Sequence, residues 1–243
     1  MNFIAKIFFT FLTFVLTTSI NVRCQGIELS ANTFYGTFEM SSMKNFHQEI
    51  TDDLSEQINV PFSVTDNFPG HYGLELQLLI NQGNFQYGLN INSITTGANT
   101  SYSDFSGDIS MSNSLRSTTV GGSFYFAPDG QSNHKLKLYI GAVVGLSLVN
   151  HDFETKLILQ SNTDITSYEF KAMNISFRPT IRLNYQIYKG IFATSFVGYC
   201  IEISDKLKLS ENEDLHLLNS EGDVVKANFS GLRLGLGIGV QLK

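Results

Sequence analysis

Charged side chains interrupt several apolar segments of this 243-residue chain at positions that alternate with apolar ones. Three are acids and four are bases: Glu39, Glu75 and Glu202, and Lys137, Arg178, Arg182 and Arg233. If each segment is a strand, alternate residues share a face, and all seven lie on the less apolar face. Charges in a narrow, poorly hydrated interior are costly unless acids meet bases. The pattern therefore predicts a structural ion-pair network, with a gated or proton-conducting path as the functional alternative.

Other residue types that could do chemistry show no spacing that indicates a site. The histidines have no HExxH or other metal-ligand spacing, and surface positions are the simpler expectation for them: His47, His71, His134, His151 and His216. The chain has no GxSxG motif and no Walker loop. We expect no catalytic residue, metal or cofactor. A lipid-modifying enzyme that uses His71 or His151 with a serine and a carboxylate is an alternative.

The first 24 residues predict a cleaved signal peptide. Lys6 supplies the positive start, residues 7–16 are apolar apart from two threonines, and cleavage is expected just before Gln25. The apolar run is shorter than the roughly 20 residues of a membrane-spanning helix, which disfavours an uncleaved anchor. Residues 25–243 then form one domain, because no linker-like or low-complexity segment divides them.

The charge and cysteine content of the mature chain exclude two classes of protein. Loss of Lys6 and Arg23 leaves 14 basic against 22 acidic residues, a net charge of −8. An acidic chain is not expected to bind nucleic acid. Cys200 is the one cysteine after residue 24, so a scaffold held by intrachain disulfides is excluded.

Alternation of apolar and polar residues recurs in eight segments and predicts eight strands. The segments are approximately 31–40, 71–80, 85–92, 114–126, 136–148, 175–187, 191–203 and 232–242. In the last one, Leu232 to Leu242 set six aliphatic residues on one parity against arginine, glycines and glutamine on the other. In the first one, Phe34, Phe38 and Met40 oppose Tyr35 and Glu39.

The connections between these segments alternate strictly in length. Three are short, at 81–84, 127–134 and 188–190, and four are long, at 41–70, 94–113, 150–170 and 204–227. Membrane barrels have this asymmetry, with short periplasmic turns and long extracellular loops. Aromatic residues near the short turns match an interfacial girdle: Phe85, Tyr87, Phe124, Phe126, Tyr185, Tyr188 and Phe192. An eight-stranded lumen has little room, so the bulky apolar set is expected to face lipid.

These features predict an all-β protein, an eight-stranded antiparallel up-and-down transmembrane β-barrel in the cell outer membrane. The whole mature chain resembles the small eight-stranded outer-membrane barrels of Gram-negative bacteria (OmpA/OmpX-like). Many members end in an aromatic residue, whereas this chain ends Gln241-Leu242-Lys243. The resemblance implies a structural, adhesive or surface-binding role through four long extracellular loops, with a charge-plugged lumen.

The expected partners are outer-membrane lipid and lipopolysaccharide, and a surface ligand or envelope protein. Acidic residues in the first and fourth long loops suit a solvated exterior, or divalent cations that bridge to lipopolysaccharide. The alternatives are a narrow porin-like channel, the lipid-modifying enzyme, and a secreted soluble lipocalin-like barrel.

Overall fold

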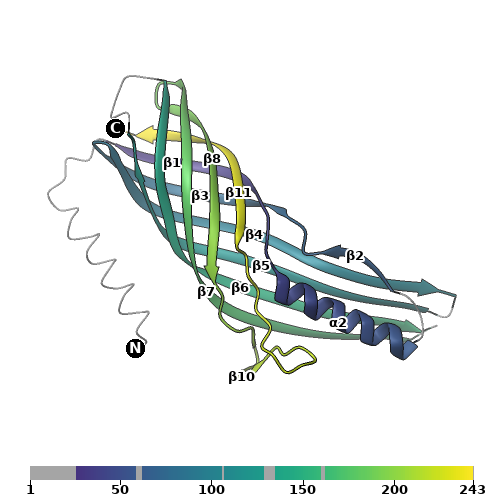
Figure 1. Ribbon diagram of the computed structural model, residues 1–243. Coiled ribbons are helices and arrows are strands. Elements are labelled where there is room, and N and C mark those ends of the chain that lie inside the picture. Colours follow the sequence, from purple (N-terminus) through teal and green to yellow (C-terminus); the bar gives the residue numbers. More distant parts are fainter. Residues whose placement is uncertain (1–25, 59–61, 106, 129–134, 160–161, 243) are drawn as a thin grey trace.

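The computed structural model describes residues 26–58, 62–105, 107–128, 135–159 and 162–242. Eight strands form an antiparallel meander that closes into a ring (Figure 1). In ring order they are β1 (Ile27–Gly36), β3 (His71–Gln82), β4 (Phe85–Asp104), β5 (Gly107–Phe126), β6 (Leu136–Leu159), β7 (Asn162–Tyr188), β8 (Ile191–Ile203) and β11 (Gly231–Leu242). β1 pairs with β11 from Ile27–Leu242 onward, which closes the barrel. The predicted fold class is thereby confirmed. The predicted signal peptide, residues 1–24, lies outside the described residues.

Large aliphatic side chains cover the outside of the ring. On β11 the alternate residues from Leu232 to Leu242 are exposed, and on β3 the same holds for Leu74, Leu76 and Leu78. Soluble monomers rarely expose continuous apolar surface of this extent. It matches the lipid-facing band of a transmembrane barrel, whose strands alternate apolar-out and polar-in.

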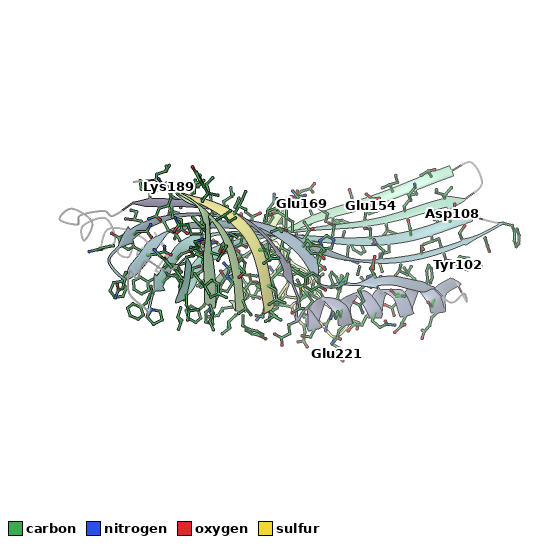
Figure 2. All side chains as sticks on the ribbon, turned by 90° about the horizontal axis from the view of Figure 1, so that it is seen from above. Tyr102, Asp108, Glu154, Glu169, Lys189 and Glu221 are labelled. Carbon is green, nitrogen blue, oxygen red and sulfur yellow. The ribbon has the colours of Figure 1, made fainter. Side chains whose placement is uncertain are left out.

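The strands β4 to β7 continue far beyond the rest of the barrel. β6 has 24 residues and β7 has 27, against 13 in β8 and 10 in β1. At about 3.3 Å per residue, β7 spans about 90 Å and β1 about 33 Å. Beyond the rim the four strands project as a sheet, with Tyr102 and Asp108 far from Lys189 at the opposite end of the molecule (Figure 2).

Two of the predicted long loops, 94–113 and 150–170, are therefore largely strand, which corrects the sequence-based prediction. In this sheet extension most outward residues are polar, such as Asn99, Ser114 and Glu154. The apolar alternation ends where the lipid-facing band ends, whereas backbone pairing continues. The extension consequently has no alternating signal in the sequence.

A helix, α2 (Ser41–Ile58), lies in the first predicted loop and packs on the inner face of the sheet extension. Met43, Phe46 and His47 are buried against the strands, and Ile50 packs at the edge of the same core. This spacing is helical, so the helix could have been predicted. Among the described residues, no helix has the length and apolarity that crossing a bilayer requires.

Short elements complete the end of the barrel that carries the sheet extension. β2 (Ser63–Asn67) pairs with β4, β9 (Lys208–Leu209) pairs with β7, and β10 (Asn212–His216) pairs with β9. A buried apolar core joins α2, the sheet extension and these connections. Its members include Met40, Met43, Phe68, Ala98, Leu115, Val149, Phe170, Leu207, Val225 and Phe229.

The predicted faces of the first strand are wrong. The strand begins at Ile27 and ends at Gly36, with Phe34 buried and Tyr35 exposed. The Phe34 side chain points into the lumen, which is apolar at the end nearer to the sheet extension. Its ring centroid lies 6.4 Å from that of Phe196. Phe192 is also buried in the lumen instead of joining the aromatic girdle.

Candidate functional site

Two buried ion pairs cross the lumen. Arg178 on β7 pairs with Glu75 on β3, and Arg182 on β7 pairs with Glu28 on β1. All four side chains are almost completely buried. Glu75 and both arginines are predicted by the sequence pattern, but Glu28 is not, because the predicted first strand begins too late. The alternation of Ile27, Leu29 and Ala31 against Glu28 and Ser30 was the available signal.

Each carboxylate also accepts hydrogen bonds from two side-chain amides. Glu75 also accepts from the Asn32 amide at 3.3 Å and from the Gln77 amide at 3.0 Å. Glu28 accepts from Gln86 at 3.1 Å and from Asn184 at 3.4 Å. Each carboxylate thus receives one arginine and two amides. These hydrogen bonds offset part of the cost of burying the charges and hold the side chains in place.

Aromatic rings fill the space around the arginines. The Arg178 guanidinium lies 5.1 Å from the Phe196 ring centroid, and that of Arg182 lies 5.8 Å from the Tyr125 ring centroid. These distances suit cation–π contact. Charged and aromatic side chains together therefore fill the lumen.

Glu202 and Arg233 lie nearer to the sheet extension than the two ion pairs do, and they bond chiefly to amides and carbonyls. Glu202 accepts from the Asn174 amide and from the backbone N–H of Phe229, each at 3.1 Å. Arg233 donates to the carbonyl of Thr37 at 2.6 Å and lies 5.2 Å from the Phe38 ring centroid. These two residues brace the loop segments that enter the top of the barrel.

The remaining two predicted lumen charges do not join the network. Glu39 is exposed, lies beyond the end of β1, and accepts from Asn228 at 3.3 Å. The backbone N–H groups of Thr37 and Glu39 still donate to the carbonyls of Leu232 and Ser230, and the odd-numbered residues of this strand face outward, so Glu39 lies outside the lumen. Lys137 is half-buried near the short-turn end, and within the described ranges it has no ion pair.

The filled lumen leaves little room for solute. A cavity of about 20 Å³ lies among Asn92, Arg178, Cys200 and Glu202, which is space for about one water molecule. From Glu28 to Arg233, the inward side chains along the lumen are buried. In this structure the charged and polar side chains of the described residues therefore pack the lumen.

A second polar cluster holds α2 against the sheet extension. His47 Nε2 lies 2.8 Å from Thr100 Oγ1, and His47 Nδ1 lies 2.9 Å from Asn113 Nδ2. His151 Nε2 lies 2.9 Å from Asn113 Oδ1, and its ring stacks on Phe170 at 5.7 Å. Asn113 thus links two histidines, which places His47 and His151 inside the protein and corrects the expected surface positions.

Burial decides the charge state of these histidines. Desolvation lowers the pKa of His151 to about 4 and lowers the pKa of His47 below its ordinary value. Both imidazoles are neutral at neutral pH, and each ring can accept one hydrogen bond and donate another. The part of the chain that the structure describes contains no group of three His, Cys, Asp or Glu side chains placed to hold a metal ion.

Comparison with known proteins finds similarity at the level of structure. No family model matches the chain, and no curated protein sequence matches it. Ail, the attachment invasion locus protein of Yersinia pestis, solved in complex with the heparin analogue sucrose octasulfate, is 14% identical with a TM-score of 0.38. The comparison covers 89% of this chain and 99% of Ail.

Two further structures are similar over most of their length. A major outer membrane protein of Thermus thermophilus is 9% identical with a TM-score of 0.45, over 89% of this chain and 99% of that one. The outer membrane protein OprG of Pseudomonas aeruginosa is 10% identical with a TM-score of 0.43, over 91% and 97%. Independently of these matches, the closed eight-stranded meander is apolar outside and polar inside. The chain therefore has the fold of the small eight-stranded outer-membrane β-barrels.

Proposed function

We propose that the protein is a non-enzymatic surface-binding protein of the cell outer membrane, and that the sheet extension of β4 to β7 is its binding element. The observation that carries this proposal is an open strand edge on β7. Residues 163–168 of β7 pair with β6 along one edge of the strand. Within the described residues, no strand pairs along the other edge, and residues 163–168 are all exposed. A lumen filled with side chains disfavours the passage of a solute. An unpaired strand edge favours the binding of a partner.

Another segment of the same chain already pairs with part of this edge. β9 pairs antiparallel with Phe170 and Lys171, and the Ser210 N–H donates to the Glu169 carbonyl at 2.8 Å. Backbone groups of a strand point alternately to its two sides. The N–H and C=O of Thr163, Ile165 and Ser167 therefore point to the same side as the Glu169 carbonyl, where β9 has ended.

An extended polypeptide is the partner that such an edge suits best. Strand addition gives affinity through main-chain hydrogen bonds, and neighbouring side chains add selectivity. Exposed Ile165 and Tyr168 lie on opposite faces of β7, so an added strand would meet one apolar residue on either face. The partner is thus an extended segment with apolar residues on both of its faces.

Proline substitutions at the edge test the proposal. Proline removes the N–H and is tolerated at strand edges. Cells that display Ile165→Pro/Ser167→Pro should lose adhesion to immobilised extracellular proteins that the wild type binds. The matched control, Ile165→Val/Ser167→Thr, keeps both N–H groups and an apolar side chain at position 165, and should retain adhesion. Equal loss in both variants, or no binding by the wild type to any protein of the panel, would contradict strand addition.

The rival functions have their own measurements. Altered lipid A in mass spectra of expressing cells would indicate a lipid-modifying enzyme. Recovery of the protein in the soluble fraction would indicate a lipocalin-like barrel. A heat-dependent shift on SDS gels, in protein from an outer-membrane fraction, is the result expected of the proposed membrane barrel.

A further inference from the structure

A row of polar residues crosses the outer surface where the apolar band ends. Thr95 pairs with Arg116, Arg116 with Asn150, Asn150 with Lys171, and Lys171 with Lys208. The row therefore runs across β4, β5, β6, β7 and β9 at one level. Its three cations, Arg116, Lys171 and Lys208, lie on one face of the sheet and are called here the cationic row.

The outward residues of the neighbouring rows show where the cationic row lies relative to the lipid bilayer. Two rows below it, the outward residues are entirely aliphatic: Ile91, Val120, Leu146 and Ile175. One row above it they are small or acidic: Gly97, Ser114, Asp152 and Glu169. The cationic row is thus the first charged level outside the apolar band. Lipid headgroups begin at this level.

The arrangement of charge in the row has a cost within the protein. Lys171 and Lys208 are direct cross-strand neighbours, and like charges so placed destabilise a sheet. Among the described residues, Lys171 forms one ion pair, with Glu169 at 3.1 Å, and both side chains are about half exposed. Among the described residues, Arg116 and Lys208 have no ion pair. Without residues 1–24 the chain carries a net charge of −8, so a cluster of three cations is not expected from its composition.

We infer that the cationic row binds the phosphate of a phosphorylated lipid headgroup in the outer leaflet. Arg116 and Lys171 are two strand spacings apart, about 10 Å, with the Asn150 amide between them. Their long side chains can converge on one phosphate, to which Arg116 presents a planar fork of donors. The bound phosphate offsets the repulsion between Lys171 and Lys208. This inference requires the membrane location but not the open edge of β7, so the two can fail separately.

Titration of the full mature protein in maltoside micelles with diphosphorylated lipid A tests the inference. The row variant is Arg116→Gln/Lys171→Gln/Lys208→Gln. The matched control, Lys44→Gln/Lys156→Gln/Lys226→Gln, removes the same charge from extracellular positions outside the row. The row variant should bind at least about tenfold more weakly, because charge-assisted hydrogen bonds are lost, whereas the control should stay within about twofold.

Two further probes identify the source of the phosphate. Dephosphorylated lipid A should bind the wild type as weakly as diphosphorylated lipid A binds the row variant, and inorganic phosphate should not compete at equal concentration. Heat-dependent mobility on SDS gels checks that each variant is folded. Equal affinities of wild type and row variant, equal loss in the control, or full competition by inorganic phosphate would each overturn the inference.

Discussion

His151 Nε2 and the side-chain oxygen of Asn113 lie 2.9 Å apart, and the nitrogen of the same amide lies 2.9 Å from His47 on α2. One asparagine on β5 therefore connects the helix to β6. Because both imidazoles are buried and their pKa values are lowered by desolvation, we expect the docking of α2 on the sheet extension to depend on pH.

Acidification should loosen α2. The folded-state pKa of His151 is lowered to about 4, whereas the unfolded value is about 6.5. Its contribution is complete above pH 6.5 and is lost as pH falls toward 4, because the open state binds the proton more readily. The loss is on the order of 3 kcal/mol. Hydrogen exchange of residues 41–58, corrected for intrinsic rates, should be faster at pH 4.5 than at pH 7.

Variants separate this effect from a general action of acid. His47→Gln/His151→Gln should remove most of the pH dependence of exchange in α2. His71→Gln, at an exposed position on β3, should leave the pH dependence unchanged. An undiminished pH response in the double variant would show that other groups release the helix.

Breaking one lumen ion pair should be more harmful than replacing both partners. Glu75→Gln leaves the buried Arg178 charge unpaired, and Arg178→Met leaves the buried Glu75 carboxylate unpaired. Each single change should lower the free energy of unfolding by about 3–5 kcal/mol, and the double change should cost less than either single change. Urea unfolding in lipid vesicles measures all three. Strict additivity would mean that the two charges do not interact.

Side-chain growth at Gly237 should destabilise the barrel. A Cβ atom there would overlap the carbonyl oxygen of Ala31, a backbone atom that cannot move aside freely. Gly237→Ala should cost about 1–3 kcal/mol in the same unfolding measurement. Gly83→Asn is the control, since Gly83 has a φ of +57°, which asparagine tolerates, and nothing within 4 Å of its Cβ position. Equal stability of Gly237→Ala and the wild type would show that β1 and β11 can separate locally.

The sequence predicts best where lipid imposes a pattern. The seventh predicted strand, 191–203, coincides with β8, and the eighth, 232–242, differs from β11 by one residue. In β11 each outward residue is apolar, so the period of two is complete, whereas β8 has Ser195 outward and Phe192 and Phe196 inward, and its parity is less clear. In the sheet extension both faces contain polar residues, and that constraint is gone.

The candidate site was only partly predictable for a different reason. Arg182 and Glu28 are 154 positions apart and lie on strands that are not adjacent. Closure of the ring brings them together across the lumen, and alternation within a single strand carries no information on closure. Alternation identified the face of Arg182, but its partner could be known only from the structure.

The filled lumen predicts that the wild-type protein forms no resolved channel. In planar bilayers it should show no single-channel steps, because two ion pairs and the aromatic rings of Phe196 and Tyr125 occupy the interior. Removing both pairs, in Glu28→Ala/Arg182→Ala/Glu75→Ala/Arg178→Ala, should join the resulting space to the cavity beside Glu202 and give discrete openings. Urea unfolding of the same variant in vesicles checks that the barrel persists. Discrete openings in the wild type would instead mean that the packed lumen rearranges in the membrane, and they would favour the narrow-channel alternative over surface binding.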